Sequence, residues 1–213
     1  MDKHARFVIF FALTIASFVP LAAGGGPAAA AACTIKGTAG DDTLQGTDGD
    51  DVICAGGGND VVFGAKGDDV ILGGPGNDTI RGNRGADRIK GGRGRDTLFP
   101  DDGNDRVRGG RGRDTIRGYL GDDTIIGGRG PDRLYGGPGL DGLRGGRGND
   151  RIRGGMDADT IVGGAGADVM IGWGGDDTID GVDSVMGNDD LNGGPGTDTC
   201  TSDPTDAEAH CEV

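Results

Sequence analysis

The sequence predicts an all-β fold, a parallel β-roll (a right-handed β-solenoid) with two parallel sheets of short strands and two nine-residue units, about 18 residues, per coil. Three observations predict it. Residues 37–180 divide into sixteen nine-residue units without insertion or deletion. Position six of every unit is Asp, position four is Gly in fifteen units, and position eight is always Leu, Ile, Val or Met. After three extra residues, 181–183, two further units follow at 184–192 and 193–201.

The unit GGPGNDTIR at 73–81 represents the repeat. Positions one to six are rich in Gly and end in Asp, which predicts a turn because Gly adopts positive φ without penalty. Positions seven to nine predict a three-residue strand whose middle side chain faces inward. Two units then close one coil, and successive coils stack as parallel strands about 4.8 Å apart. Position eight should fill the core, and positions seven and nine should face outward.

The acidic composition suggests that bound cations are needed to stabilise the fold. The chain of 213 residues contains 49 Gly and has a formal net charge of −14. Stacking places the Asp residues of alternate units above one another, in one column at each edge of the roll. Such columns repel strongly unless cations neutralise them. Carboxylates in flexible Gly-rich loops suit Ca²⁺ better than Mg²⁺, and the repeats lack the Cys or His ligands that softer metals prefer.

This frame resembles the hemolysin-type calcium-binding repeat of the RTX family, with the consensus GGxGxDxUx, over residues 37–180 and 184–201. The resemblance implies several Ca²⁺ ions, each held between two turns on one edge by position-six carboxylates and turn backbone carbonyls. Asp42 then pairs with Asp60 and Asp51 with Asp69, and the uninterrupted frame of sixteen units allows two fewer pairings than units, fourteen. The candidate metal ligands are Asp42, Asp51, Asp60, Asp69, Asp78, Asp87, Asp96, Asp105, Asp114, Asp123, Asp132, Asp141, Asp150, Asp159, Asp168, Asp177, Asp189 and Asp198.

Several units depart from the frame. Asp157 replaces the Gly at position four, where we expect a costly left-handed backbone conformation. Pro100 replaces the Gly that opens unit 100–108. Pro131 and Leu140 occupy position five. The insertion 181–183 predicts a bulge or an irregular coil.

The charge is unevenly distributed. Residues 81–153 contain 17 Lys and Arg against 11 Asp, whereas the rest of the chain contains 4 basic and 24 acidic residues. Within the turns, Arg occupies position three in five units and position five in two: Arg84, Arg93, Arg111, Arg129 and Arg147, and Arg95 and Arg113. We expect the sites to survive if these positions supply only carbonyls. A guanidinium could instead pair with the Asp columns, so the hypothesis is weaker calcium binding by the central coils than by the acidic flanks.

The outward positions are also ordered. At position nine of one sheet, aromatic residues and Arg alternate from Phe63 to Arg153, which predicts a cation–π ladder. The opposite sheet has a basic patch at Arg88, Lys90, Arg106 and Arg108. These features either stabilise the centre of the roll or present a basic central face to an anionic partner, such as a polysaccharide or another cell-surface polymer.

The chain is expected to have three segments. Residues 1–32 are predicted to be a secretory signal peptide followed by an Ala/Gly-rich segment. Lys3 and Arg6 precede an apolar run at 7–19, which is the pattern of such a signal. Residues 33–201 form the calcium-binding roll, and 202–213 form a C-terminal cap. We therefore expect a secreted, extracellular protein that has no membrane span once the signal is cleaved, and an association with the cell surface is the alternative location.

The four Cys residues form two outer pairs, which suggests disulfides in an exported protein. A bond between Cys200 and Cys211 would fold the tail over the open end of the roll. Cys33 and Cys54 would be offset by three residues on neighbouring strands of a regular roll, about 10 Å. That distance exceeds the reach of a disulfide, so the lead-in must depart from the repeat if this bond forms.

The predicted function is calcium-dependent folding after export, with a structural or cell-surface role. One alternative is an adhesin or an ice- or polysaccharide-binding roll, and another is a non-catalytic remnant of an RTX enzyme or toxin. No enzyme is expected, because 36 residues before the frame and 12 after it leave no room for the separate catalytic domain of such relatives. No metalloprotease or G-x-S-x-G motif occurs. Nucleic-acid binding is not expected at this net charge.

Overall fold

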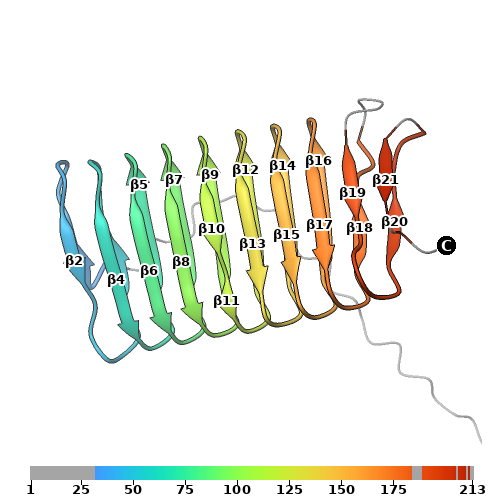
Figure 1. Ribbon diagram of the computed structural model, residues 1–213. Coiled ribbons are helices and arrows are strands. Elements are labelled where there is room, and N and C mark those ends of the chain that lie inside the picture. Colours follow the sequence, from blue (N-terminus) through green and yellow to red (C-terminus); the bar gives the residue numbers. More distant parts are fainter. Residues whose placement is uncertain (1–31, 184–188, 205, 210, 212–213) are drawn as a thin grey trace, which may run out of the picture. The chain divides into compact units, whose positions relative to one another are not determined.

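The computed structural model describes residues 32–183, 189–204, 206–209 and 211. These residues form a stack of coils in which two parallel sheets face each other across one core (Figure 1). All but the last residue of the predicted leader at 1–32 lies outside the described residues. Within the described part, no helix is long and apolar enough to cross a membrane.

Each coil contributes one strand to each sheet, and neighbouring strands pair two repeat units apart, as Ile71 with Ile89. Sheet A contains, in spatial order, β1 (Ile35–Lys36), β3 (Val52–Cys54), β5 (Val70–Pro75), β7 (Arg88–Arg93), β9 (Arg106–Arg111), β12 (Thr124–Arg129), β14 (Gly142–Arg147), β16 (Thr160–Ala165), β18 (Thr178–Asp180) and β20 (Thr199–Thr201). Sheet B contains β2 (Thr43–Gln45), β4 (Val61–Lys66), β6 (Thr79–Arg84), β8 (Thr97–Asp102), β10 (Thr115–Arg117), β13 (Arg133–Gly137), β15 (Arg151–Gly155), β17 (Val169–Trp173), β19 (Asp190–Asn192) and β21 (Ala207–Ala209), and β11 (Tyr119–Leu120) also pairs with β8. The predicted parallel β-solenoid with two repeat units per coil is confirmed.

The core consists of the position-eight side chains of both sheets, as predicted. Apart from Ala55 and Pro100, every buried apolar residue in the described part of the chain comes from position eight. Leu44 and Cys200, at position eight of end units, are partly buried against this core. The core residues are Ile53, Ala55, Val62, Ile71, Ile80, Ile89, Leu98, Val107, Ile116, Ile125, Leu134, Leu143, Ile152, Ile161, Met170, Ile179 and Leu191.

The prediction of three-residue strands is wrong for most coils. Strands such as β5 (Val70–Pro75) and β7 (Arg88–Arg93) continue through positions one to three of the next unit. Position one is buried beside the core in most coils, and the ladder continues past it even where Pro100 replaces Gly in β8 (Thr97–Asp102). The turn is therefore confined to positions four to six, with the Asp at its end.

Positive φ angles mark the turns, but not where the sequence predicted strain. Asp157 does not adopt a positive φ, and its Oδ2 accepts a hydrogen bond from the Gly139 amide at 3.0 Å. The non-Gly residues with positive φ instead occupy position two, and all lie on the edge where the chain passes from sheet B to sheet A: Ala65, Asn83, Asp101, Tyr119 and Trp173. Such angles are unfavourable for bulky side chains. The expectation for Asp157 was wrong, because its turn does not adopt the positive φ that Gly139 and Gly148 have at the same position.

The insertion 181–183 is absorbed in one longer coil, as predicted. Val169 pairs with Asp190 and Thr178 with Thr199, three residues further along the chain than in the regular coils. The Asp columns nevertheless continue, because the Asp168 amide donates to Asp189 Oδ1 at 2.9 Å. The extra residues therefore change the connection and not the register.

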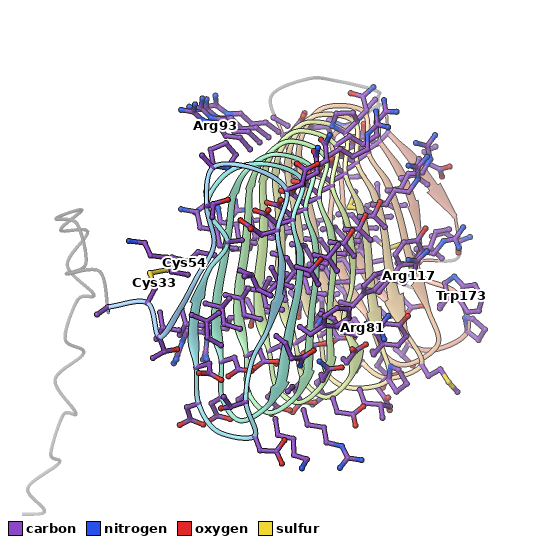
Figure 2. All side chains as sticks on the ribbon, turned by 90° about the vertical axis from the view of Figure 1, so that its left-hand side faces the viewer. Cys33, Cys54, Arg81, Arg93, Arg117 and Trp173 are labelled. Carbon is purple, nitrogen blue, oxygen red and sulfur yellow. A yellow bond between two sulfur atoms is a disulfide. The ribbon has the colours of Figure 1, made fainter. Side chains whose placement is uncertain are left out.

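Disulfides close both ends of the roll. Cys33 and Cys54 are bonded with Cα atoms 5.8 Å apart, and Cys200 and Cys211 with Cα atoms 5.7 Å apart. Lys36 pairs in regular register with Cys54. The chain bends at Thr34, so that Cys33 turns back to Cys54, and the predicted departure of the lead-in is confirmed (Figure 2). At the other end the tail adds β21 to sheet B beside β19.

The predicted cation–π ladder is present on sheet B. The guanidinium of Arg81 lies 5.1 Å from the Phe99 ring centroid, and that of Arg117 lies 5.8 Å from the same ring. Tyr135 receives Arg117 at 5.1 Å and Arg153 at 5.7 Å. The ladder begins at Arg81, because no contact between Arg81 and Phe63 is found in the described residues. Stacking aromatic rings between the Arg residues separates charges that would otherwise face one another.

We predict that Ile116→Ala lowers the free energy of unfolding of the calcium-saturated chain by about 2–5 kcal/mol, because it leaves a cavity in a core only one residue deep per strand. Leu140→Ala is the matched control, since Leu140 is 60% exposed. It should change stability by less than about 0.5 kcal/mol. Urea unfolding followed by circular dichroism measures both, and equal losses would contradict the assigned core.

Candidate functional site

The position-six Asp residues form two columns, which are buried except at the half-buried Asp42. One lies on the A-to-B edge, where the chain passes from sheet A to sheet B, and the other on the B-to-A edge. Asp51 is 6% exposed and the Asp residues from Asp60 to Asp198 are 0–3% exposed. Charged side chains are rarely buried so completely without a partner. The A-to-B column contains Asp42, Asp60, Asp78, Asp96, Asp114, Asp132, Asp150, Asp168 and Asp189, and the B-to-A column contains Asp51, Asp69, Asp87, Asp105, Asp123, Asp141, Asp159, Asp177 and Asp198.

One oxygen of each carboxylate joins neighbouring coils. The Asp60 amide donates to Asp78 Oδ1 at 3.0 Å, and the Asp87 amide donates to Asp105 Oδ1 at 2.7 Å. The same bond recurs along both columns. It fixes the carboxylate between two turns, which is where the sequence predicted that a cation would bind.

The second carboxylate oxygen, Oδ2, is buried and lacks a hydrogen-bond partner in sixteen of these residues. A buried unpaired acceptor costs roughly 1–3 kcal/mol, and more when it is charged. Sixteen such atoms in one small roll require a common partner. The residues are Asp60, Asp69, Asp78, Asp87, Asp96, Asp105, Asp114, Asp123, Asp132, Asp141, Asp150, Asp159, Asp168, Asp177, Asp189 and Asp198.

A space beside each Oδ2 is lined by oxygen. A Cβ atom added to Gly82 would collide with Asp87 Oδ2 and would lie 2.7 Å from the carbonyl oxygen of Pro100 in the next coil. The corresponding atoms surround position one in many units, as at Gly145, where the Gly163 carbonyl oxygen would lie 2.7 Å away. The Gly residues keep this space free of carbon. A carboxylate oxygen facing a carbonyl oxygen is a donor set that suits Ca²⁺.

Backbone carbonyls are essential to any such site. No group of three or more His, Cys, Asp or Glu side chains that could hold a metal ion occurs in the described part of the chain. Each Asp would therefore bind a cation together with carbonyl oxygens of the turns. The residues present fit calcium, and the number of ligands depends on how the Gly-rich turns adjust around it.

Burial raises the pKa of the column carboxyl groups from Asp69 to Asp189. The pKa of Asp132 rises to about 8, and the pKa values of Asp87 and Asp123 rise to about 7, because desolvation disfavours the charged form. Backbone hydrogen bonds to these carboxylates oppose the shift. Near neutral pH the metal-free columns are therefore partly protonated, and a bound cation would restore the carboxylate.

The first residue of each column differs from the rest. Thr38 donates to Asp42 Oδ2 from its amide at 2.6 Å and its hydroxyl at 2.9 Å. Thr47 donates to Asp51 Oδ2 in the same way, at 2.7 Å and 2.9 Å. The Thr47 amide also lowers the pKa of Asp51, the direction opposite to that of its column neighbours. Thr at position two thus satisfies the oxygen that is unpaired elsewhere.

In the described part of the chain, two position-one residues fill the space that Gly leaves open. Ala55 and Pro100 carry side-chain carbon at this position in the units of Asp60 and Asp105. Both residues are buried. Their sites are consequently narrower on that side than the sites beside Gly82 or Gly145.

Sequence reasoning missed two features of the turns. Asn and Asp side chains at position five accept hydrogen bonds from the next coil, as Asn77 Oδ1 does from the Arg95 amide at 2.7 Å. In addition, Asp206 lies in the tail, and its Oδ1 accepts from the Asp189 amide at 3.3 Å. The frequent Asn and Asp at position five were the available signal for the first feature. The second had no such signal, because Asp206 lies in the tail, after the last repeat unit at 193–201.

The central Arg residues do not neutralise the columns. Ion pairs in the described residues join Lys66 with Asp48, Arg81 with Asp101, and Arg84 with Asp102, none of which is a position-six Asp. Arg93 and the equivalent residues one, two and three coils further on are exposed. The interior carboxylates thus remain available to a cation even where the surface is basic.

Comparison with known families agrees with this geometry. A family model described as the RTX calcium-binding nonapeptide repeat matches residues 34–62, 63–98, 99–134, 117–152, 135–170, 153–183 and 186–201. The matches together span nearly all of the roll. No similar protein was found among curated sequences.

We predict that Gly82→Ala reduces the number of calcium ions bound, because its Cβ would occupy the space beside Asp87 Oδ2. Gly49→Ala is the control, since a Cβ there meets no atom within 4 Å. Isothermal titration calorimetry should show a lower stoichiometry or a weaker phase for Gly82→Ala alone. Identical titrations of the two variants would place the cation elsewhere.

The raised pKa values predict that the metal-free roll loses stability as pH rises. Between the ordinary value of 3.8 and a folded value of about 8 for Asp132, the folded state binds protons more tightly than the unfolded chain. Its stability is therefore greatest at the acidic end of this window and falls toward the alkaline end. Calcium binding needs the ionised carboxylate, so its affinity should show the opposite trend.

Circular dichroism of calcium-free protein checks this between about pH 5.5 and about pH 8. We expect the strand signal to be stronger at the acidic end. The calcium-saturated chain at the alkaline end is the control and should retain its strands. A strand signal that grows with rising pH in calcium-free buffer would contradict the prediction.

Proposed function

Since the chain belongs to the RTX calcium-binding nonapeptide-repeat family, we propose that it is a secreted protein that folds on binding calcium after export and serves a structural or cell-surface role. One observation carries the proposal. Sixteen buried carboxylate oxygens lack a partner, and each is fixed between two turns. Bound Ca²⁺ would supply positive charge and accept these oxygens as ligands.

The proposed ligands are the position-six Asp residues with carbonyls of the neighbouring turns. The Oδ1 hydrogen bond orients each carboxylate, and position-one Gly leaves room beside Oδ2. Asp42 and Asp51 are proposed as the weakest ligands, because Thr38 and Thr47 already donate to their Oδ2 atoms. A cation there would have to displace these hydrogen bonds.

Two observations support folding outside the cell. The disulfides Cys33–Cys54 and Cys200–Cys211 suit an oxidising compartment. Extracellular calcium modules commonly bind at about 10⁻⁴–10⁻³ M, far above cytosolic calcium concentrations. A chain with this requirement would remain unfolded during synthesis and fold after export. The proposed domain limits, a leader at 1–32, a roll at 33–201 and a cap at 202–213, agree with this order of events.

Circular dichroism of the purified chain in millimolar calcium, and again after chelation, tests the proposal. We expect a strand signal in calcium that disappears in chelator near neutral pH, because the carboxylates of the columns that are ionised there repel one another without a counterion. Magnesium at the same concentration is the control and should not replace calcium, since its strict octahedral geometry suits these turns poorly. A strand signal that persists unchanged in chelator would refute calcium-driven folding.

A further inference from the structure

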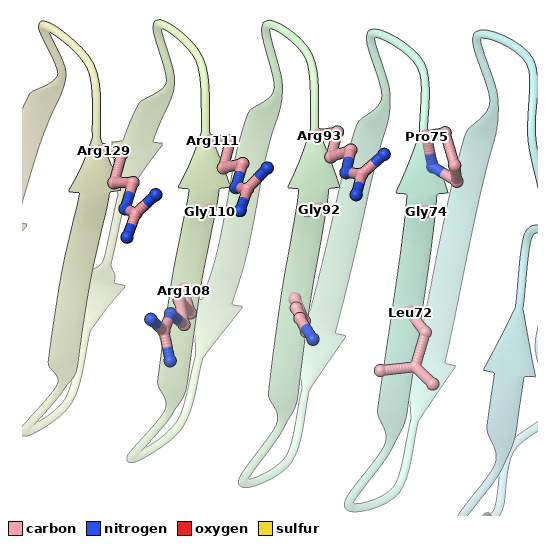
Figure 3. Close-up of a pocket in the computed structure, with 11 residues that line it drawn as sticks. Leu72, Gly74, Pro75, Gly92, Arg93, Arg108, Gly110, Arg111 and Arg129 are labelled. Atoms are coloured by element: carbon pink, nitrogen blue, oxygen red, sulfur yellow. The ribbon is translucent and has the colours of Figure 1, made fainter.

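A basic groove runs along sheet A beside the A-to-B edge (Figure 3). Its volume is about 580 Å³. Position-two glycines, Gly74, Gly92 and Gly110, form its floor. On one side stand the position-three residues Arg93, Arg111 and Arg129, and on the other stand Lys90 and Arg108. The two basic lines are three residues apart along each strand, about 10 Å.

The position-three side of this groove is a column of like charges. Strand pairing aligns Arg93 with Arg111, Arg111 with Arg129, and Arg129 with Arg147, so four guanidinium groups recur about 4.8 Å apart. Like charges opposite one another on neighbouring strands destabilise a sheet. Within the described residues, no ion pair joins any of these four to an acidic group. The column thus imposes a cost that a bound anion would remove.

The opposite edge shows that this cost is avoidable at the same repeat position. Position three on the B-to-A edge carries both signs, in the order Asp48, Lys66, Arg84 and Asp102. Each basic residue therefore has an acidic neighbour, and Lys66 pairs with Asp48 at 2.6 Å and Arg84 with Asp102 at 3.9 Å. On sheet B, Phe99 and Tyr135 separate the Arg residues of the cation–π ladder. Figure 2 shows Arg93 at one edge and Arg81 and Arg117 on the other sheet. Only the groove side of the roll, among the described residues, carries a run of four unseparated Arg.

We propose that this groove binds a linear acidic polysaccharide, lying along the axis of the roll with about one hexuronate unit per coil. Its carboxylates would alternate between the Arg93–Arg147 column and the line of Lys90, Arg108 and Arg144, in which Ile126 stands between the two Arg residues. An order of Arg93, Arg108, Arg129 and Arg144 uses one basic residue per coil and passes by Ile126. The pyranose repeat is similar in length to the spacing of coils, and the Gly floor leaves room for sugar rings. Carboxylates and guanidinium groups form strong, often bidentate, hydrogen bonds. The inference rests on the proposed function, because the groove exists only in the folded roll.

Charge and shape favour this occupant over other anions. The outward positions that line the groove contain no aromatic side chain on which bases could stack, and such stacking is the usual platform for single-stranded nucleic acid. Duplex phosphates follow a helical path and would meet a straight column at few points. A membrane surface is flat, whereas these basic lines border a recess. A narrow chain with regularly spaced charges matches both lines.

The test uses fluorescence anisotropy of an end-labelled oligogalacturonate of about six units, long enough to pass the roughly 14 Å of the Arg column. The protein is the calcium-saturated full chain. The test variant carries Arg93→Gln, Arg111→Gln, Arg129→Gln and Arg147→Gln. The control removes the same charge from the opposite sheet with Arg117→Gln, Arg133→Gln, Arg151→Gln and Arg153→Gln. A methyl-esterified oligomer, single-stranded oligo(dT) and phosphatidylglycerol vesicles are competing probes.

We expect the oligouronate to bind, the groove variant to lose at least about tenfold in affinity, and the control to lose no more than about twofold. The esterified oligomer should not bind. Absence of oligouronate binding, equal losses in both variants, or tighter binding of the DNA or the vesicles would each overturn the proposal. Circular dichroism of the unaltered chain and of each variant in calcium distinguishes a failure of calcium-driven folding from a failure of the groove to bind. A chain that calcium fails to fold contradicts the proposed function, whereas a folded chain that fails to bind contradicts the groove alone.

Discussion

The fold depends on how its buried carboxylates are neutralised. Each regular coil buries two position-eight side chains and two Asp residues. Burying an apolar side chain contributes roughly 1.5–3 kcal/mol, whereas burying an unpaired charge costs several times more. The hydrophobic core therefore cannot offset two ionised, unpaired carboxylates in every coil. The backbone hydrogen bond to Oδ1 satisfies one oxygen and leaves Oδ2 dependent on a proton or a cation. Coil geometry and chemistry are inseparable in this molecule, because the atom that lacks a partner is the atom fixed between coils.

Protons and calcium are alternative ways to meet this requirement. Protonation removes the charge, and the raised pKa of Asp132 shows how strongly the interior favours the neutral form. Calcium keeps the carboxylate ionised and links it to carbonyl oxygens of the turns. The disulfides act differently, because they restrain the two ends of the stack, where a terminal strand has a neighbour on one side only. The hydrogen bonds from Thr47 to Asp51 Oδ2 also stabilise an end of the stack, since they satisfy the first carboxylate of that column without an ion.

The uninterrupted nine-residue register made most of the architecture predictable. Separation by two repeat units identified the strand partners, the core positions, the Asp columns and the aromatic–Arg ladder from the sequence alone. The predictions failed where local conformation decides the outcome. Many strands extend into position three, and a repeat consensus does not distinguish an extended Gly from a turning one. The Asp157 turn avoids the expected φ. Thr38 donates a hydrogen bond to Asp42, although in the sequence it is simply a residue that replaces the consensus Gly at position two.

The separation of inward and outward positions explains why so regular an interior can have so uneven a surface. Positions one, four, six and eight are held by close backbone contacts, the carboxylates or the core, whereas positions three, five, seven and nine are exposed or half-buried. An outward residue repeated in every second unit becomes a line along the roll without any change inside. The stability supplied by the columns can then support a line of like charges. Because Arg93 and its aligned partners share one strand register, their spacing is fixed by the backbone ladder and not by flexible loops. Such a surface is already ordered before a partner arrives, which lowers the entropic cost of binding a regular polymer.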